Sequence, residues 1–151
     1  MDLRTHVSVV ILRPDGKLLL VQEEKAANRG KWNLPGGHWE AGETLYDAAV
    51  REAREETHLA VEPVALIGVY SRPVVPPNKV QSTRFVYLAP YAGGEPAAGD
   101  EILAVRWATP DEVDAIADAE LVSVDSLRKI CAAVRAGVRY PLAVVNEPRR
   151  E

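Results

Sequence analysis

The chain has 151 residues, of which 47% are hydrophobic and 26% charged, and its formal net charge is −4 at pH 7. This length and composition are typical of one globular domain over residues 1–151 and exclude an intrinsically disordered chain. The absence of a dense Lys and Arg cluster argues against polymeric nucleic acid as a partner. An acidic protein that binds a phosphorylated small molecule must overcome charge repulsion, so the composition leaves room for a bound divalent cation.

The cysteine content and the apolar segments indicate the cellular compartment. Cys131 is the only cysteine, so an intrachain disulfide is impossible and a reducing compartment is expected. The first residues do not resemble a signal peptide, and no apolar run reaches the roughly 18 residues of a membrane span. The sequence therefore predicts a soluble, cytoplasmic protein that does not associate with membranes.

The first elements in chain order are a predicted hairpin and a loop. The β-branched run from His6 to Leu12 and the apolar run from Lys17 to Gln22 flank Asp15-Gly16, a pair typical of hairpin turns. The polar residues 23–31 predict a loop. Pro35-Gly36-Gly37 follows, and there we expect another group to approach the main chain closely.

A helix is predicted next, from about Leu45 to Thr57. Thr44 followed by Asp47 resembles a capping box, and apolar residues then recur at helical intervals. On such a helix, Glu52, Glu55 and Glu56 lie within about 100° of one another, so one flank carries all three carboxylates.

The second half of the chain predicts three strands and two helices. The strands are Val61–Tyr70, Val80–Ala89 and Ile102–Ala108, and the helices run from Pro110 to about Ala117 and from Ser126 to Ala136. Strands and helices are interleaved, and at least one strand pair is antiparallel. The sequence therefore predicts the α/β class, with a mixed β-sheet covered by helices.

The three glutamates suggest metal-assisted hydrolysis. Like charges this close repel one another unless cations or Arg51 neutralise them. Mg²⁺ and Mn²⁺ prefer hard oxygen ligands, and a carboxylate left over from coordination could take a proton from an attacking water. The alternative is a solvated, salt-bridged helix face with no catalytic role.

The spacing around this helix resembles the Nudix box. Gly37 is followed after five residues by Glu43, and after seven more by Arg51-Glu52-Ala53-Arg54-Glu55-Glu56-Thr57-His58-Leu59. The resemblance implies the α/β/α sandwich of that family, hydrolysis of nucleoside diphosphates linked to another group, and a requirement for Mg²⁺ or Mn²⁺.

The same resemblance assigns roles to residues. It makes Glu52, Glu55 and Glu56 the metal ligands or the catalytic base, with the Gly37 carbonyl as a further ligand and Arg51 as an orienting residue. Glu43 would help Arg51 orient this set, and Glu101, just before a late strand, is similar to a residue that supplies the base or another ligand in several relatives. His58 stands where the box normally has Gly, which suits a left-handed helix end; His tolerates that conformation at some cost.

Three features concern the substrate. The segment Gly30–His38, Arg106-Trp107 and Arg139-Tyr140-Pro141-Leu142 resemble the NudJ-type phosphatase subgroup, which implies nucleoside tri- and diphosphates as substrates. Pro73 instead resembles the ADP-ribose pyrophosphatase pattern. A small set of side chains could stack on a base or bind phosphate: Trp32, Trp39, Arg29, Lys31 and Arg84.

Other readings compete with these. One enzyme alternative is an ADP-ribose or nucleotide-sugar pyrophosphatase. An alternative of another class is a non-catalytic nucleotide-sensing module, against which the complete set of carboxylates argues. Family members are often dimers, so the resemblance also implies a possible homodimer.

Overall fold

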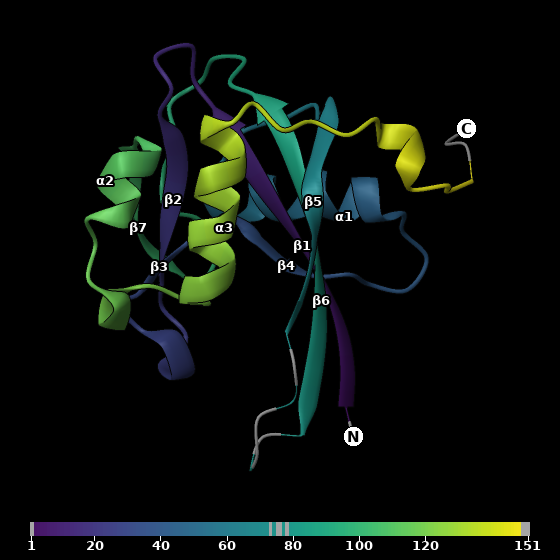
Figure 1. Cartoon of the computed structure of the whole chain (residues 1–151), viewed down its shortest axis with the longest axis horizontal. Coiled ribbons are helices and arrows are strands. Elements are labelled where there is room, and N and C mark those ends of the chain that lie inside the picture. The colour runs from purple at the N-terminus through teal and green to yellow at the C-terminus, as the bar shows by residue number, and fades with distance from the viewer. Residues whose placement is uncertain (1, 73, 75–76, 78, 149–151) are drawn as a thin grey trace.

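The computed structural model describes residues 2–72, 74, 77 and 79–148, which form a seven-stranded mixed sheet with helices on both faces (Figure 1). The strands are β1 (Asp2–Leu12), β2 (Leu18–Glu23), β3 (Trp32–Asn33), β4 (Gly36–His38), β5 (Ala65–Arg72), β6 (Val80–Pro90) and β7 (Ile102–Ala108). The helices are α1 (Leu45–Thr57), α2 (Pro110–Asp114) and α3 (Val124–Arg135), with single 3₁₀ turns at Ala26–Asn28, Asp118–Glu120 and Leu142–Val144. The predicted α/β/α arrangement is confirmed.

Strand β1 lies at the centre of the sheet. One edge pairs in parallel with β6 along all eleven residues, from Asp2 opposite Val80 to Leu12 opposite Pro90. Its other edge pairs with β2 only at Leu12 and with β4 at His6 to Ser8. Because β2 diverges from β1, β4 occupies the gap between them, and the glycines of β4 lie in the middle of the sheet.

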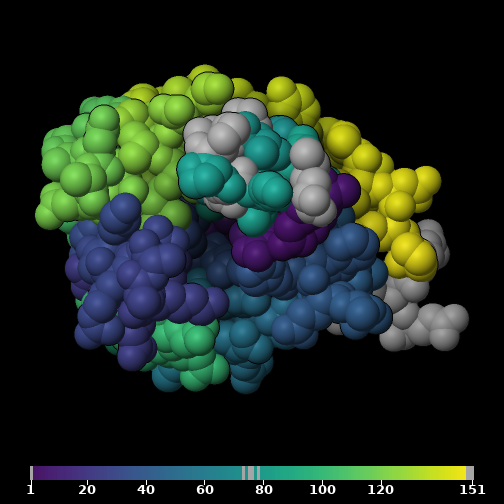
Figure 2. Space-filling view, turned by 90° about the horizontal axis from the view of Figure 1, so that it is seen from below, coloured from purple at the N-terminus to yellow at the C-terminus, as the bar shows by residue number. Residues whose placement is uncertain are grey.

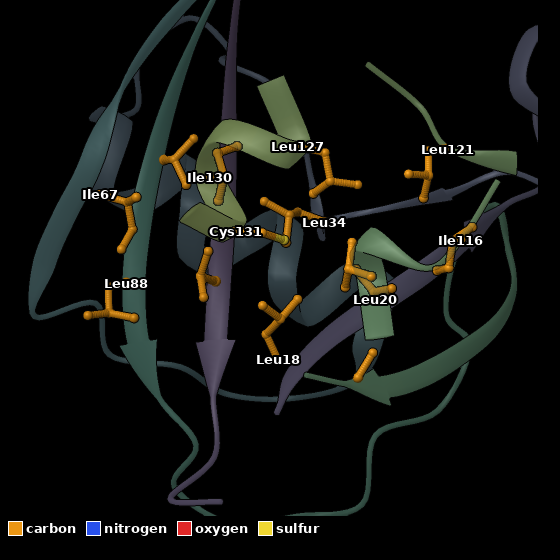
Figure 3. Close-up of a cluster of buried hydrophobic side chains, with 14 of the residues drawn as sticks. Leu18, Leu20, Leu34, Ile67, Leu88, Ile116, Leu121, Leu127, Ile130 and Cys131 are labelled. Atoms are coloured by element: carbon orange, nitrogen blue, oxygen red, sulfur yellow. The ribbon is translucent and has the colours of Figure 1, made fainter. Parts of the chain in front are cut away.

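The alternation of side chains along the strands produces two cores. On β1, Val7, Val9 and Ile11 pack on the face covered by α1, whereas Val10 packs on the face covered by α3. Figure 3 shows the α3 side, where Leu18 and other strand residues meet the helix. This core also contains Leu20, Leu34, Ile67, Leu88, Leu127, Ile130 and Cys131.

Helix α1 has the predicted limits, and local interactions set both of its ends. The Thr44 hydroxyl accepts a hydrogen bond from the Asp47 N–H at 3.0 Å, which caps the first turn. At the other end His58 adopts the left-handed conformation that Gly normally provides there, with φ 63°. Ala48, Ala49 and Ala53 are fully buried against the sheet, and Glu52 and Glu56 lie on the same side of the helix, where Glu56 is itself buried.

The loop before β7 closes the C-terminal end of α1. The N–H groups of Gly99 and Asp100 donate to the carbonyls of Glu56 and Glu55, at 3.0 and 2.9 Å. A Cβ at position 99 would collide with the Glu55 carbonyl, so glycine is required for this approach. The contact brings Glu101 close to the glutamates of α1.

Other predicted boundaries differ by a few residues. Strand β5 begins at Ala65 rather than Val61, since Pro63 cannot donate to a ladder. Helix α2 ends at Asp114, and α3 starts at Val124, earlier than expected. Within the described part of the chain, no helix is both long and apolar enough to cross a membrane.

Candidate active site

The side of α1 that carries the glutamates and the glycines of β4 border one cavity. It has a volume of about 230 Å³ and is lined by Glu52, Glu55 and Glu56 together with Gly36 and Gly37. Its remaining lining residues are Lys25, His38, Glu40, Arg51, Asp100 and Glu101. The residues that resemble the Nudix box therefore meet in space.

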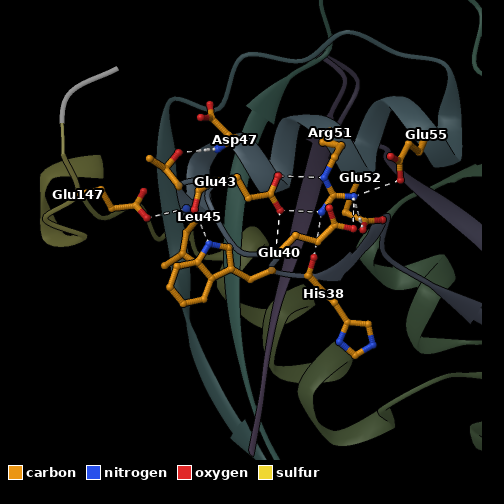
Figure 4. A network of polar contacts seen from close by, with 11 residues as sticks. His38, Glu40, Glu43, Leu45, Asp47, Arg51, Glu52, Glu55 and Glu147 are labelled. Carbon is orange, nitrogen blue, oxygen red and sulfur yellow. Dashed lines mark hydrogen bonds and ion pairs between the residues drawn. The ribbon is translucent and has the colours of Figure 1, made fainter. Parts of the chain in front are cut away.

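Arg51 is the centre of the polar network in this cavity (Figure 4). Its Nε and Nη2 donate to the two carboxylate oxygens of Glu43, at 3.0 and 2.8 Å. Its Nη1 donates to Glu52 at 2.8 Å and to Glu55 at 3.2 Å. Nη2 also donates to the His38 carbonyl at 3.0 Å, which ties α1 to the end of β4. One guanidinium thus orients three carboxylates and the glycine-containing strand.

Glu56 is the most deeply placed carboxylate of the set, with 9% of its surface exposed. Its Oε1 accepts a hydrogen bond from the Gly36 N–H at 2.8 Å. Burial raises the pKa of Glu56 to about 9, because the charged form loses hydration. Burial also raises the pKa of Glu52, even though its hydrogen bond to Arg51 acts in the opposite direction. A cation in this cavity would favour the charged form of both groups.

Gly37 lies directly against the Glu52 carboxylate. A Cβ built at position 37 would come within 2.5 Å of Glu52 Oε1. A Cβ at position 36 would collide with the backbone of Val7 and Ser8 on β1. Only glycine at both positions therefore allows β4 to pair with β1 while α1 carries its carboxylates past it.

The donor set suits a hard divalent cation by its chemistry. It offers carboxylate oxygens from Glu52, Glu55 and Glu56 and a backbone carbonyl from β4, which are the ligands that Mg²⁺ and Mn²⁺ prefer. Among the described residues, however, no three His, Cys, Asp or Glu side chains are gathered closely enough to form a metal site. The reason is visible in the contacts: Arg51 binds Glu52 and Glu55, while Glu56 turns towards the Gly36 N–H.

A second cavity, of about 280 Å³, adjoins the first. Both are lined by Lys25, Gly36, Gly37, His38 and Glu56. Figure 2 looks towards this side of the molecule, where the purple start of β1, the blue segment before α1 and the yellow-green region of α3 border a hollow.

A row of side chains across four strands forms one wall of the second cavity. Tyr70 on β5 is opposite Arg84 on β6, Arg84 is opposite His6 on β1, and His6 is opposite His38 on β4. All four line the cavity, and the two imidazole rings lie 4.5 Å apart. The register of the sheet therefore places a cation and two imidazoles beside the glutamate cavity.

Two polar atoms in this row are shielded from solvent and have no hydrogen-bond partner: Arg84 Nη1 and His6 Nε2. Burial lowers the pKa of Arg84 to about 10, and the nearby Arg72 guanidinium acts in the same direction. Burial likewise lowers the pKa of His6 to about 4, with His38 and Arg84 adding to the effect. Arg84 Nη1 is thus held here without a hydrogen-bonded anion, although the Glu23 carboxylate lies near enough to oppose the lowering of the Arg84 pKa.

Known proteins resemble the chain over most of its length. The family model for the NUDIX domain matches residues 2–129. The chain belongs to the Nudix hydrolase family. Phosphatase NudJ from Escherichia coli K12 is 32% identical over 148 residues, which cover 95% of this chain and 92% of that protein.

Solved structures agree with this assignment. A NUDIX hydrolase from Nitrosomonas europaea superposes with a TM-score of 0.85 at 29% identity and covers 97% of this chain and 98% of its own. A MutT NUDIX hydrolase from Burkholderia pseudomallei has a TM-score of 0.72 at 28% identity, covering 89% and 98%. This Nudix hydrolase therefore has the expected fold, with the box residues on β4 and α1.

Glu101 is near the Nudix glutamates, as the resemblance implies, but it has a partner. Its side chain forms an ion pair with Lys25 Nζ at 3.2 Å, and its carbonyl accepts from the Glu24 N–H. Its φ of 60° is unusual for a residue other than glycine. Its role as base or ligand stays a prediction.

Four of the five predicted substrate-binding residues do not line either cavity. Trp32 packs against the core on the α3 side, with the Arg106 guanidinium over its ring, and the Trp39 indole donates to the Glu43 carbonyl at 2.7 Å. Arg29 donates to the Glu24 carbonyl, and Lys31 belongs to a backbone turn. Arg84 alone among the five lines a cavity. Pro73, the other specificity clue, lies outside the described residues.

Sequence reasoning missed His6, Arg72, Lys25 and Ser123, all of which line the second cavity. Of these four only His6 lies in a predicted strand, where the alternation of side chains could have indicated its face of the sheet. The sequence could not show which strands are neighbours. His6 and Arg84 lie side by side because β1 pairs in parallel with β6, and the sequence does not reveal that pairing.

Proposed function

We propose that this Nudix hydrolase uses Mg²⁺ or Mn²⁺ to hydrolyse a diphosphate linkage in nucleoside tri- and diphosphates. The supporting observation is the convergence of Glu52, Glu55, Glu56 and Gly37 on one cavity. That cavity adjoins a second one containing Arg84, so a phosphorylated compound could extend from one into the other.

The metal ions would be held by Glu52, Glu55 and Glu56 and by the Gly37 carbonyl. When bound, they would supply polarisation of the phosphoryl oxygens and a lower pKa for water. The chain contributes the geometry. Arg51 fixes the directions of Glu52 and Glu55, and Gly37 leaves room for the Glu52 carboxylate.

The proton of the attacking water needs an acceptor on the chain. Among the glutamates to which the Nudix resemblance assigns a role, Glu55 and Glu101 have the most exposed side chains, at 44% and 63%. We propose that one of these two accepts the proton, because water can reach their exposed carboxylates, whereas Glu56 is buried against the Gly36 N–H and the Glu52 side chain is only 13% exposed. The pH dependence of kcat in Glu55→Gln and in Glu101→Gln would distinguish the two candidates. The variant that lacks the base should no longer show the increase of kcat with rising pH.

Similarity to phosphatase NudJ over 95% of the chain supports nucleoside tri- and diphosphates as the substrate class. The alternative, an ADP-ribose or nucleotide-sugar pyrophosphatase, was suggested by Pro73. A Nudix domain of Shewanella oneidensis NrtR solved with ADP-ribose is 18% identical and indicates a common fold alone. Pro73→Ala would test this alternative by changing relative activity between the two substrate classes.

The deciding experiment measures phosphate and pyrophosphate release from nucleoside triphosphates, nucleoside diphosphates, ADP-ribose and sugar nucleotides, with Mg²⁺, with Mn²⁺ and with a chelator. Wild type, Glu56→Gln and the exposed control Glu62→Gln would be compared. We expect metal-dependent release that falls by about three orders of magnitude in Glu56→Gln and is unchanged in the control. Nucleotide binding without turnover by wild type would refute the proposal and favour a sensing module.

A further inference from the structure

The second cavity contains a cation with an unused donor. Arg84 extends from β6 between Tyr70 on β5 and His6 on β1. Its Nη1 is shielded from solvent and has no hydrogen-bond partner. A buried donor left without an acceptor is costly to the fold, so a partner supplied from outside the chain would explain its presence.

The other cations around the cavity differ from Arg84 in having partners. Arg4 pairs with Asp2 at 2.9 Å, and Lys25 pairs with Glu101 at 3.2 Å. Arg72 donates through Nη1 to the Ser123 hydroxyl at 3.1 Å, and no carboxylate among the described residues forms an ion pair with it. Glu23 also lines the cavity, but its carboxylate accepts from the Asn33 amide at 3.2 Å. Arg72 and Arg84 therefore carry positive charge that the described residues leave without an ion-pair partner.

The N-terminus of α3 also indicates that the second cavity binds an anion. This helix has twelve residues, and its N-cap Ser123 makes no side-chain capping hydrogen bond, because its hydroxyl accepts from Arg72 instead. Ser123 has a φ of 49°, a left-handed conformation that is unfavourable for serine. Ser123 and Ser126 both line the cavity. Free N–H groups at a helix N-terminus favour a bound anion, and Ser123 and Ser126 place this N-terminus beside the cavity that Arg84 lines.

The shape of the cavity limits what accompanies the anion. Neither Trp32 nor Trp39 lines it, and Tyr70 is the one Trp, Tyr or Phe among the described lining residues. The rings of His6 and His38 also line it, but they lie only 4.5 Å apart, too close to admit a base between them. Its volume of about 280 Å³ lies just below the roughly 300–1,000 Å³ of typical ligand pockets. A phosphorylated sugar is therefore a better match than a stacked base.

We propose that Arg72, Arg84 and the N-terminus of α3 bind a second phosphoryl group of the substrate, separated from the scissile diphosphate by a sugar. The substrate class is then a diphosphate ester whose organic part carries an additional phosphate. The inference rests on the proposed function, because it assumes that the diphosphate occupies the neighbouring cavity with the α1 carboxylates. Arg84 would determine specificity, as guanidinium groups bind phosphate through two parallel hydrogen bonds.

The first test measures binding without catalysis. Ribose 5-phosphate and unphosphorylated ribose would be titrated calorimetrically into the metal-free protein. We expect ribose 5-phosphate, but not ribose, to bind wild type. The affinity should fall about tenfold or more in Arg84→Gln, recover partly in Arg84→Lys, and stay unchanged in Arg139→Gln, which removes an exposed arginine outside both cavities. Equal binding by wild type and Arg84→Gln, or no binding by wild type, would overturn the proposal.

The second test uses pairs of substrates that differ by one phosphate. Nucleoside 3′-phosphate 5′-diphosphates would be compared with nucleoside 5′-diphosphates, and ADP-ribose 2′-phosphate with ADP-ribose. For at least one pair, wild type should show a kcat/KM about tenfold higher for the more phosphorylated member, and Arg84→Gln should bring that ratio towards one through KM. Hydrolysis of all four with unchanged ratios in Arg84→Gln would refute this inference while the proposed function stands. No hydrolysis of any compound would refute the proposed function, whereas the binding test would remain decisive for the inference.

A stability measurement separates ligand binding from a structural role. Because Arg84 lacks an anionic partner, Arg84→Gln should raise the melting temperature of the ligand-free protein by a few degrees. Ribose 5-phosphate should raise the melting temperature of wild type and not that of Arg84→Gln. A lower melting temperature in Arg84→Gln, with ribose 5-phosphate binding unchanged, would assign Arg84 a structural role and overturn the proposal.

Discussion

The two adjoining cavities differ in whether their arginine side chain has a partner in the chain. In the cavity beside α1, Arg51 is hydrogen-bonded to Glu43, Glu52 and Glu55 at 2.8 to 3.2 Å. In the cavity beside β6, Arg84 has a donor with no acceptor. In one cavity the arginine is therefore matched by carboxylates of the chain, and in the other it is not.

The difference indicates how each cavity is used. Matched charges fix the directions of side chains, which suits a place where reacting groups must be held in position. A buried cation without a partner lowers the stability of the folded protein when the cavity is empty, and a bound anion restores that stability. The cavity beside α1 is thus organised for chemistry, and the cavity beside β6 for recognition. Changes to each should consequently have different signatures.

Among the changes that test this comparison, the largest expected effect comes from displacing one carboxylate. In Gly37→Ala the added Cβ would come within 2.5 Å of Glu52 Oε1, so the carboxylate must move. We expect kcat to fall by about 100-fold, since displacements of about 1 Å at reacting groups have effects of that size. Steady-state kinetics with saturating Mg²⁺ would measure it. Gly68→Ala, whose Cβ would meet only the Tyr70 side chain, should lose far less, and equal losses would contradict the steric explanation.

Removing the central guanidinium would make the first cavity resemble the second, with charges left unmatched. Arg51→Gln leaves Glu43, Glu52 and Glu55 without their cation. We expect kcat/KM to fall about 10- to 100-fold and the free energy of unfolding to fall by about 1–3 kcal/mol.

Urea denaturation with and without Mg²⁺ would test that change. Mg²⁺ should stabilise Arg51→Gln more than it stabilises wild type, because the cation replaces the lost positive charge. Arg54→Gln on the same helix removes an exposed arginine that lines neither cavity, and it should behave like wild type. A similar response of both variants would argue against the orienting role of Arg51.

The unmatched cavity should make stability depend on pH. The pKa of His6 falls from 6.5 to about 4 in the folded chain, chiefly through burial. The folded state thus disfavours protonated His6, so this stability is fully present above pH 6.5 and is lost as the pH falls towards 4. We expect a loss of about 1–2 kcal/mol, reduced by partial solvent exposure.

Thermal unfolding between pH 4 and pH 8 would show the dependence on His6. His6→Gln should flatten the slope over that window, whereas His58→Asn, at an exposed position, should retain it. An unchanged slope in His6→Gln would show that His6 is not the titrating group.

The smallest expected effect concerns the N-terminus of α1. The Glu147 carboxylate accepts hydrogen bonds from the N–H groups of Leu45 and Tyr46, at 2.6 and 3.3 Å (Figure 4). Glu147→Gln should lower the free energy of unfolding by about 0.5–1 kcal/mol, because it removes a negative charge from the positive end of the helix dipole. Chemical denaturation would measure the change. The loop variant Glu95→Gln should show none, and an equal loss there would indicate a general effect of charge.

The sequence alone determined the elements whose signals are local. The limits of α1 follow from Thr44, from the alanines on its buried face and from His58 at its left-handed end, all within fifteen residues. The glutamates of that helix and Gly37 could therefore be predicted as one cluster. The limits of β5 were less accurate, since the contribution of Pro63 depends on which strand lies beside it.

Only the tertiary structure showed which residues line the second cavity and where the tryptophan side chains lie. His6 and Arg84 meet because β1 and β6 pair in parallel, a contact between segments far apart in the chain that no local pattern encodes. Trp32 flanks the glycines in sequence, but β3 turns its side chain towards the core on the α3 side. Local propensities determine where helices and strands begin and end, whereas strand order and register determine which side chains share a cavity.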